Sequence, residues 1–225
     1  MTRPSLVIAL HGTRHAAGLT VAGELRDEVA RQLPGVDIHL GWVDIHDELL
    51  DTTLAGLGPA VVVPAFLTAG YHVEHDVPEA IATVGGRAVA SEHIGLGVLG
   101  AVRDRLLEAG PLGDAVVLAA AGSKRVGALG EVQDAARVLA AWIDRPVRVG
   151  YLYAAHPSVE ETVAGLRAEG FADLTVGTYA LAPGLYADRL AALDVRAVAR
   201  PVGLHPEFVT AIAQRYRSKV PALAM

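Results

Sequence analysis

The sequence of 225 residues predicts an α/β protein of two similar lobes, each an open parallel four-stranded sheet flanked by helices. Three observations predict this fold. Short, continuous apolar runs alternate with amphipathic stretches along the whole chain, which is typical of βαβ units. Blocks of the first half recur in the second half at nearly constant spacing. A turn-rich break at residues 110–113 (Gly-Pro-Leu-Gly) separates the two halves.

The repetition is clearest in three blocks of sequence. Residues 6–14 recur 110 positions later as 116–124, residues 41–57 recur 109 positions later as 150–166, and residues 67–72 recur 114 positions later as 181–186. Spacing this constant indicates an internal duplication. We therefore expect an N-terminal lobe at residues 1–110 and a C-terminal lobe at residues 111–225.

The expected strands are runs of Val, Ile, Leu and Ala, which suit strands that are buried on both faces of a parallel sheet. They lie at residues 5–11, 36–43, 60–67 and 87–91 in the first copy, and at 115–121, 147–153, 173–180 and 196–199 in the second.

The expected helices fall between these strands. Val21, Leu25, Val29 and Leu33 lie at helical spacing with charges on the opposite face, which predicts a helix at residues 21–33. Comparable helices are expected at 47–57, 74–83, 99–109, 127–143, 158–169, 185–192 and 206–218. In two of them, at Pro78-Glu79 and Pro206-Glu207, a proline and an acidic residue fit the first helical turn.

Composition excludes several classes of protein. Hydrophobic residues make up 52% of the chain, enough for two cores, yet no apolar run approaches the roughly 20 residues that span a bilayer. The chain starts without a signal-peptide pattern. It has no cysteine, which excludes disulfides, thiolate zinc sites and clusters held by its own thiols. The net charge of −6 argues against nucleic-acid binding. We expect a cytoplasmic protein that binds neither a membrane nor nucleic acid.

Three candidate metal ligands follow three successive strands of the first copy. His11 ends the first expected strand, Asp44 ends the second, and His72 comes a few residues after the third. Ligands of open α/β sheets bind beyond the carboxyl ends of the strands, so these side chains can converge. Two imidazoles and a carboxylate suit a divalent ion such as Fe²⁺ or Co²⁺. The corresponding residues of the second copy are Ala121, Tyr153 and Tyr186, which predicts a single metal site in the first lobe.

Structural roles are the alternative for each of these residues. A histidine at a strand end is more often a hydrogen-bonding scaffold residue, and Asp44 could cap the following helix. Asp76, before Val77-Pro78, is expected to start a helix, with His75 a solvated neighbour. His46 would point to the same face as Asp44 on an extended backbone. Scaffold roles are expected for His39, His93 and His205.

Six motifs together resemble one known family. They are ALHGTRHAAG at 9–18, VVVPAFLTAGYHVEHDVPEAI at 61–81 and IGLG at 94–97, then AAAGSKR at 119–125, YALAPGLYADRL at 179–190 and PVGLHP at 201–206. In this order they resemble the sirohydrochlorin chelatases of the CbiX/SirB type, which are class II chelatases that insert metal without ATP. The chain is similar to their long, duplicated form over its whole length.

The resemblance implies a chelatase-like fold and the insertion of a divalent metal into sirohydrochlorin, held in a cleft between the lobes, in siroheme or cobalamin biosynthesis. In the family, the histidines that match His11 and His72 bind metal and help to remove the pyrrole protons. An acidic residue joins them, and Asp44 stands at its position. No cofactor is implied beyond the substrate metal, and the duplicated form is expected to be a monomer. Fe²⁺ is favoured over Co²⁺, because some cobalt-linked relatives carry histidine-rich stretches or a cysteine-ligated cluster that this chain lacks.

The substrate of these chelatases carries many carboxylates, which the protein must bind. Arg14, Lys124 and Arg125, in corresponding loops of the two copies, are the expected anchors, and ordinary exposed charge is the alternative. Tyr186 is expected to line the cleft in place of a histidine.

Two other functions are compatible with parts of the sequence. A non-catalytic carrier of metal or tetrapyrrole would need the same ligands as a chelatase. Residues 95–100 match G-x-G-x-x-G, which raises the alternative of a dinucleotide-binding oxidoreductase. We disfavour that alternative because the motif comes late in the first copy and no acidic residue ends a further strand about 20 residues on.

Overall fold

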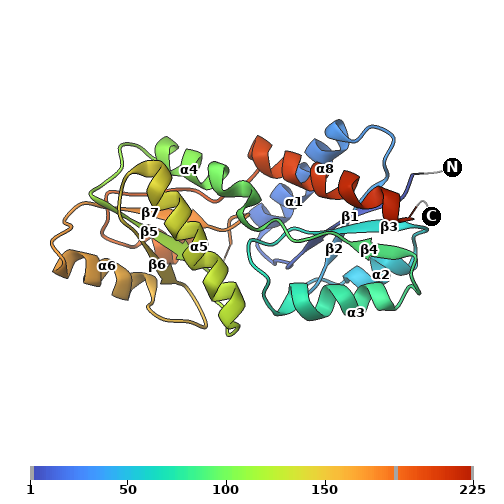
Figure 1. The fold of residues 1–225 in the computed structure, drawn as a ribbon, viewed down its shortest axis with the longest axis horizontal. Helices are drawn as coiled ribbons and strands as arrows, with labels where there is room; N and C mark the ends of the chain where they lie inside the picture. Colours follow the sequence, from blue (N-terminus) through green and yellow to red (C-terminus); the bar gives the residue numbers. More distant parts are fainter. Residues whose placement is uncertain (1–2, 185–186, 224–225) are drawn as a thin grey trace. The chain divides into compact units, whose positions relative to one another are not determined.

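The structure is a computed structural model that describes residues 3–184 and 187–223. Within these residues it contains eight strands in two sheets (Figure 1). The first sheet holds β1 (Ser5–Leu10), β2 (Ile38–Trp42), β3 (Ala60–Pro64) and β4 (Ala88–Ala90), and the second holds β5 (Ala115–Ala120), β6 (Val147–Tyr151), β7 (Leu174–Tyr179) and β8 (Ala197–Val198). Each strand lies inside a range predicted from the sequence.

Both sheets are parallel throughout and have the same topology. Their strand orders are β2-β1-β3-β4 and β6-β5-β7-β8. The chain builds outward from β1 to β2, then returns to add β3 and β4 on the other side. The point where the direction reverses, between β1 and β3, is where open α/β sheets bind ligands. The predicted fold class of two duplicated, open, parallel four-stranded sheets is confirmed.

The first sheet has helices on both faces. Val7 and Ala9 of β1 point to one face, because side chains alternate along a strand, and they share a core with α2 (Leu50–Ala55) and α3 (Val77–Ala82). The other face is covered by α1 (Ala16–Gln32) and α8 (Pro206–Lys219), as Figure 1 shows. All five residues of β3 are buried, which explains its continuous apolar sequence.

The second sheet repeats this plan. One face shares a core with α6 (Val159–Ala168) and with Leu190 of α7 (Ala187–Ala191). The helices α4 (Leu99–Glu108) and α5 (Val126–Ile143) cover the other face. Three short turns complete the elements, namely the π-helical turn η1 (His72–Asp76) and the 3₁₀ turns η2 (Gly95–Val98) and η3 (Val220–Leu223). Among the described residues, no helix is both long enough and apolar enough to cross a bilayer.

The helix that follows the fourth strand of each copy packs on the sheet of the other copy. α4 follows β4 but contacts β7, and α8 follows β8 but contacts β3. The compact units are accordingly residues 1–97 with 204–225, and residues 98–203. The expected lobes were residues 1–110 and 111–225. The observed units differ from them because α4 belongs to the unit of the second sheet and α8 to the unit of the first sheet. An amphipathic pattern shows that a helix has a buried face, but it does not show which sheet covers that face.

Polar contacts attach α8 to the start of the chain. The Tyr216 hydroxyl donates to the Pro4 carbonyl at 2.7 Å, and the Arg217 guanidinium donates to the Gln32 carbonyl at 2.8 Å. The Gln32 amide in turn donates to the Thr210 hydroxyl at 3.2 Å. The last helix of the sequence is therefore part of the unit formed by the first copy.

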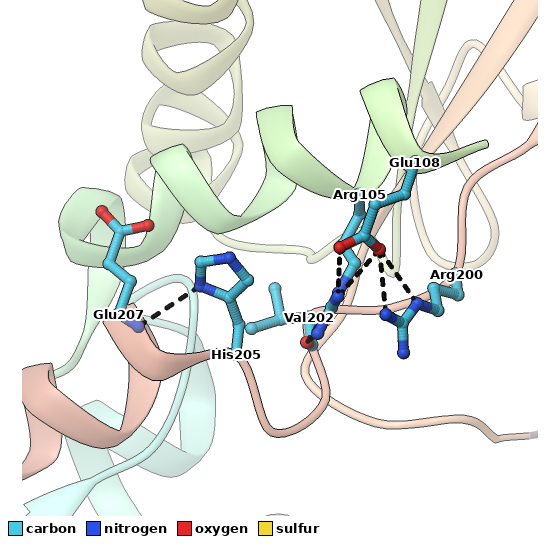
Figure 2. Close-up of polar contacts among 6 residues, drawn as sticks. All are labelled: Arg105, Glu108, Arg200, Val202, His205 and Glu207. Atoms are coloured by element: carbon cyan, nitrogen blue, oxygen red, sulfur yellow. Dashed lines mark hydrogen bonds and ion pairs between the residues drawn. The ribbon is translucent and has the colours of Figure 1, made fainter. Parts of the chain in front are cut away.

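A buried arginine attaches α4 to the segment after β8 (Figure 2). Arg105 is only 7% exposed and donates to the Val202 carbonyl from Nε at 3.1 Å and from Nη2 at 2.8 Å. Its Nη1 also donates to both carboxylate oxygens of Glu108. Arg200 donates to one of these two oxygens as well. Hydrogen bonds from Arg105 and then Arg200 lower the pKa of the Glu108 carboxyl.

We predict that Arg105→Met destabilises the protein. The substitution leaves the Val202 carbonyl without its two donors, so the free energy of unfolding should fall by about 2–3 kcal/mol in a urea titration. Arg200→Ala is the matched control, because it removes the exposed partner of the same Glu108 carboxylate and should cost much less. Equal losses in the two variants would contradict a special role for Arg105.

Two glycines allow the loop after each central strand to pass directly over its neighbour. Gly12 has φ +104°, and a Cβ atom added to it would lie 1.8 Å from the Asp44 carbonyl oxygen. Gly122 has φ +90°, and its Cβ would lie 1.9 Å from the Tyr153 carbonyl oxygen. Both the backbone conformation and the space therefore require glycine in each copy.

We predict that Gly122→Ala lowers stability by more than about 1 kcal/mol, because the added methyl group meets backbone that cannot move aside. Gly130→Ala is the control. Gly130 lies inside α5 with nothing within 4 Å of the added atom, so alanine should be neutral or stabilising. The difference is measured as the shift in the unfolding midpoint, and a Gly122→Ala variant as stable as Gly130→Ala would overturn the prediction.

Candidate metal site

The backbone brings His11 and Asp44 together at the carboxyl edge of the first sheet. β1 and β2 pair in parallel up to Leu10 and Trp42, and the hydrogen-bond ladder continues beyond the strand ends. The Val43 amide donates to the Leu10 carbonyl at 2.9 Å, and the Asp44 amide donates to the His11 carbonyl at 3.0 Å. The two residues therefore leave neighbouring strands side by side.

His72 reaches the same edge from the third strand. The Ala65 amide donates to the Ala9 carbonyl at 2.8 Å, which holds the loop after β3 against β1. The loop then turns into η1, whose first residue is His72. The His72 and His11 rings lie with their centroids 4.6 Å apart and their planes at 88°. Both imidazoles thus stand at the switch point between β1 and β3.

One ligand atom from each of His11, Asp44 and His72 lies within 4.8 Å of the other two. Ligand atoms about 2.1 Å from a shared ion are separated by at most roughly 4 Å, so small side-chain rotations close this group around a metal. His11 and Asp44 are exposed and His72 is partly buried, which leaves the site open to a large ligand.

The local contacts of His11 and Asp44 leave a ligand atom on each. His11 Nδ1 lies 3.2 Å from the Gly12 carbonyl oxygen, and the ring has a second nitrogen, Nε2, for a ligand. Asp44 Oδ1 accepts from the Ile45 amide at 2.7 Å, and the carboxylate has a second oxygen for a ligand. The helix-capping alternative for Asp44 is not seen, because α2 has Leu49 at its N-cap position.

Asp76 has a partner that the sequence analysis missed. It stands directly before α3 as expected, but its side chain makes no capping hydrogen bond there. Its carboxylate instead forms a very short contact with His72 Nδ1. The expected position of Asp76 at the start of α3 is confirmed, but its side chain serves His72 and does not cap the helix. The spacing of four residues was the available signal, because side chains at i and i+4 meet on a helical turn.

The loop that carries Asp44 has an unusual backbone that recurs in the second copy. Ile45 has φ +57°, and Ala154, which corresponds to it, has φ +55°. Tyr153 stands at the position that corresponds to Asp44, and this residue is 66% exposed. Since the same conformation occurs without the ligands, it belongs to the scaffold and not to the metal site alone.

The other histidines have different partners. His46 stacks on Trp42 with ring centroids 4.8 Å apart, and its Nδ1 accepts from the Glu48 amide at 3.1 Å. Among the described residues, the group whose ligand atoms lie within 4.8 Å of one another does not include His46. Elsewhere, His39 pairs with Asp37, His93 lies against Gly95, and the His75 ring lies tilted against Tyr71. His205 caps α8 by accepting from the Glu207 amide (Figure 2).

The predicted anchors lie in two loops of the same shape. Arg14 is exposed in the loop between β1 and α1, while Lys124 is exposed and Arg125 partly buried in the loop between β5 and α5. Each loop has a hydroxyl turn, in which Thr13 accepts from the His15 amide and Ser123 accepts from the Arg125 amide. The two loops belong to different compact units, so the anchoring role stays a prediction. Tyr186 lies outside the described residues.

The G-x-G-x-x-G sequence at 95–100 lacks the structural setting of a dinucleotide site. It follows β4, which is an edge strand, and it runs through η2 into α4. A dinucleotide-binding motif belongs to the turn after a strand at the switch point, where the pyrophosphate meets a helix N-terminus. The oxidoreductase alternative therefore has no support in the fold.

The CbiX family model matches residues 5–106 and again residues 115–219. The chain belongs to the CbiX family. The family resemblance and the internal duplication predicted from the motifs are both confirmed. A comparison with curated proteins found no match.

Solved structures of similar proteins cover nearly all of this CbiX-family chain. SirB from Bacillus subtilis with Fe³⁺ is 21% identical with a TM-score of 0.80, over 97% of this chain and 96% of that one. The sirohydrochlorin chelatase SirB from Bacillus subtilis subspecies spizizenii in complex with cobalt is 18% identical with a TM-score of 0.76, at the same coverage. CbiX, described as the terminal enzyme for siroheme biosynthesis in denitrifying bacteria, is 18% identical with a TM-score of 0.69, over 96% of this chain and 99% of that one.

Proposed function

We propose that this protein inserts a divalent metal ion into sirohydrochlorin without ATP. The observation that carries the proposal is the convergence of His11, Asp44 and His72 at the switch point of the first sheet, with ligand atoms within 4.8 Å of one another. The chain belongs to the CbiX family, and two similar solved structures are SirB with Fe³⁺ and the sirohydrochlorin chelatase SirB in complex with cobalt. Both facts support a metal substrate of this kind.

The residues of the site suit delivery of a metal better than permanent retention. Two imidazoles and one carboxylate bind a first-row ion less tightly than thiolates would, so a macrocycle with four nitrogen donors can take the ion over. His11 and Asp44 are exposed, which leaves open positions on the ion for the incoming nitrogens. As the metal enters, two N–H protons leave the macrocycle, and an imidazole is a suitable acceptor near neutral pH.

Fe²⁺ is the proposed physiological metal, with siroheme as the product. The chain has no cysteine for a ligated cluster, and its histidines are not gathered into a histidine-rich stretch. Co²⁺ binds a given set of nitrogen and oxygen ligands more tightly than Fe²⁺ does, so activity with cobalt in a purified system would not by itself identify the cellular metal. The sequence also contains no P-loop motif, which supports a reaction independent of ATP.

The test follows the absorbance of sirohydrochlorin under anaerobic conditions after addition of Fe²⁺ or Co²⁺. We expect rapid conversion with the native protein, and a loss of at least about 100-fold in kcat/KM for His11→Ala and His72→Ala, because each removes a ligand that acts on the reacting metal. His46→Ala is the matched control, since His46 lies nearby but stacks on Trp42 outside the ligand group. It should retain activity.

Two outcomes would contradict the proposal. Conversion no faster than in a protein-free mixture would remove the assignment as an enzyme. If the protein nevertheless bound both the metal and the tetrapyrrole, it would act as a carrier. Equal loss of activity in the His46→Ala variant would place the reacting metal elsewhere in the first unit.

A further inference from the structure

We infer that Asp76 is a positioning residue that fixes the His72 ring so that Nε2, and not Nδ1, faces the metal. The inference rests on the proposed function for the identity of the ligand. It adds to the site a residue that acts through His72 and is not itself proposed as a ligand.

The geometry of η1 creates the pair. In this π-helical turn the Val77 amide donates to the His72 carbonyl, five residues back, and the widened turn brings the Asp76 carboxylate against His72 Nδ1. Both side chains are 27% exposed, so water competes only partly for the contact. The Phe66 and Tyr71 rings also flank His72, with centroids 6.3 Å and 6.1 Å from it. The imidazole therefore has neighbours on several sides and a polar partner on one edge.

The chemistry of this pair determines which nitrogen can bind a metal. A neutral imidazole carries one N–H, and an ionised carboxylate can only accept a hydrogen bond. Nδ1 must therefore hold the proton that it shares with Asp76, which places the lone pair on Nε2. A histidine ligand whose other nitrogen donates to a carboxylate has its tautomer and its ring orientation set before the metal arrives.

The sequence of the second copy supports a role tied to His72. At the offset of 114 residues that relates the two blocks, His72 corresponds to Tyr186 and Asp76 corresponds to Leu190. Leu190 is only 3% exposed and belongs to the apolar core of the second sheet. At these two corresponding positions the second copy has neither the histidine nor the carboxylate. In the first copy, moreover, the Asp76 side chain makes no capping bond to α3, so the helix does not account for it.

The test measures Co²⁺ binding to the full-length protein without tetrapyrrole, by the visible absorption of the bound ion. We expect Asp76→Ala to bind Co²⁺ about 10- to 100-fold more weakly than the native protein. Asp76→Asn keeps the size of the side chain and an acceptor oxygen, so it should fold and show an intermediate loss. Asp37→Asn is the matched control, because Asp37, directly before β2, pairs with His39 of that strand at 2.8 Å, away from the site. It should bind Co²⁺ normally.

A second measurement separates positioning from a general effect on stability. Nitrogen-15 NMR of histidine-labelled protein reports the tautomer of His72 directly, and His72→Ala identifies its signals. We expect the form protonated at Nδ1 in the native protein and a mixture of tautomers in Asp76→Ala. Unchanged Co²⁺ affinity and an unchanged tautomer in Asp76→Ala would overturn the inference. Since neither measurement needs turnover, a native protein that fails to convert sirohydrochlorin would refute the proposed function without affecting this result.

Discussion

The site depends on the close approach of two backbone loops at the end of the first sheet. β1 is the buried central strand, and its parallel pairing with β2 continues past the last residue of each strand, through the Asp44 amide and the His11 carbonyl. Gly12 makes this possible, because a side chain there would collide with the Asp44 carbonyl. The exposed ligands are thus set by buried strands and by backbone hydrogen bonds. Such support is what a reactive group needs in order to keep its position.

The sequence predicted the strands well because their signal is strong. Continuous apolar runs with the length of strands left few other assignments for these segments. The candidate ligands could then be identified because they stand where those runs end. The start of α1 was less readable, since residues 16–20 carry no apolar periodicity although the helix begins at Ala16. The contact between Asp76 and His72 was signalled only by their spacing of four residues, and nothing in the sequence pattern predicted the π-helical turn that carries it. The exchange of α4 and α8 depends on which of the two similar sheets each helix packs against. The apolar pattern of a helix does not distinguish between them.

The two copies show which features belong to the scaffold and which to the chemistry. Strand order, the glycine at the loop crossing and the left-handed residue at Ile45 or Ala154 recur in both. The proposed ligands His11, Asp44 and His72 do not, and neither does Asp76. The second copy therefore keeps the loop conformations of the first without its proposed metal ligands. A conformation shared by both copies is therefore weak evidence of function, and a difference between them is stronger evidence.

The exchanged helices also set the order in which the protein can be completed during synthesis. Residues 98–203 form one uninterrupted unit, whereas the other unit is made of two segments from opposite ends of the sequence. The bond from Arg217 to Gln32 spans 185 residues of chain. A ribosome that has made the first sheet must still make the whole second unit before α8 can cover β3. The half that is encoded first is finished last, and until then the part of its sheet that α8 covers, over β3, is exposed to water and to other chains.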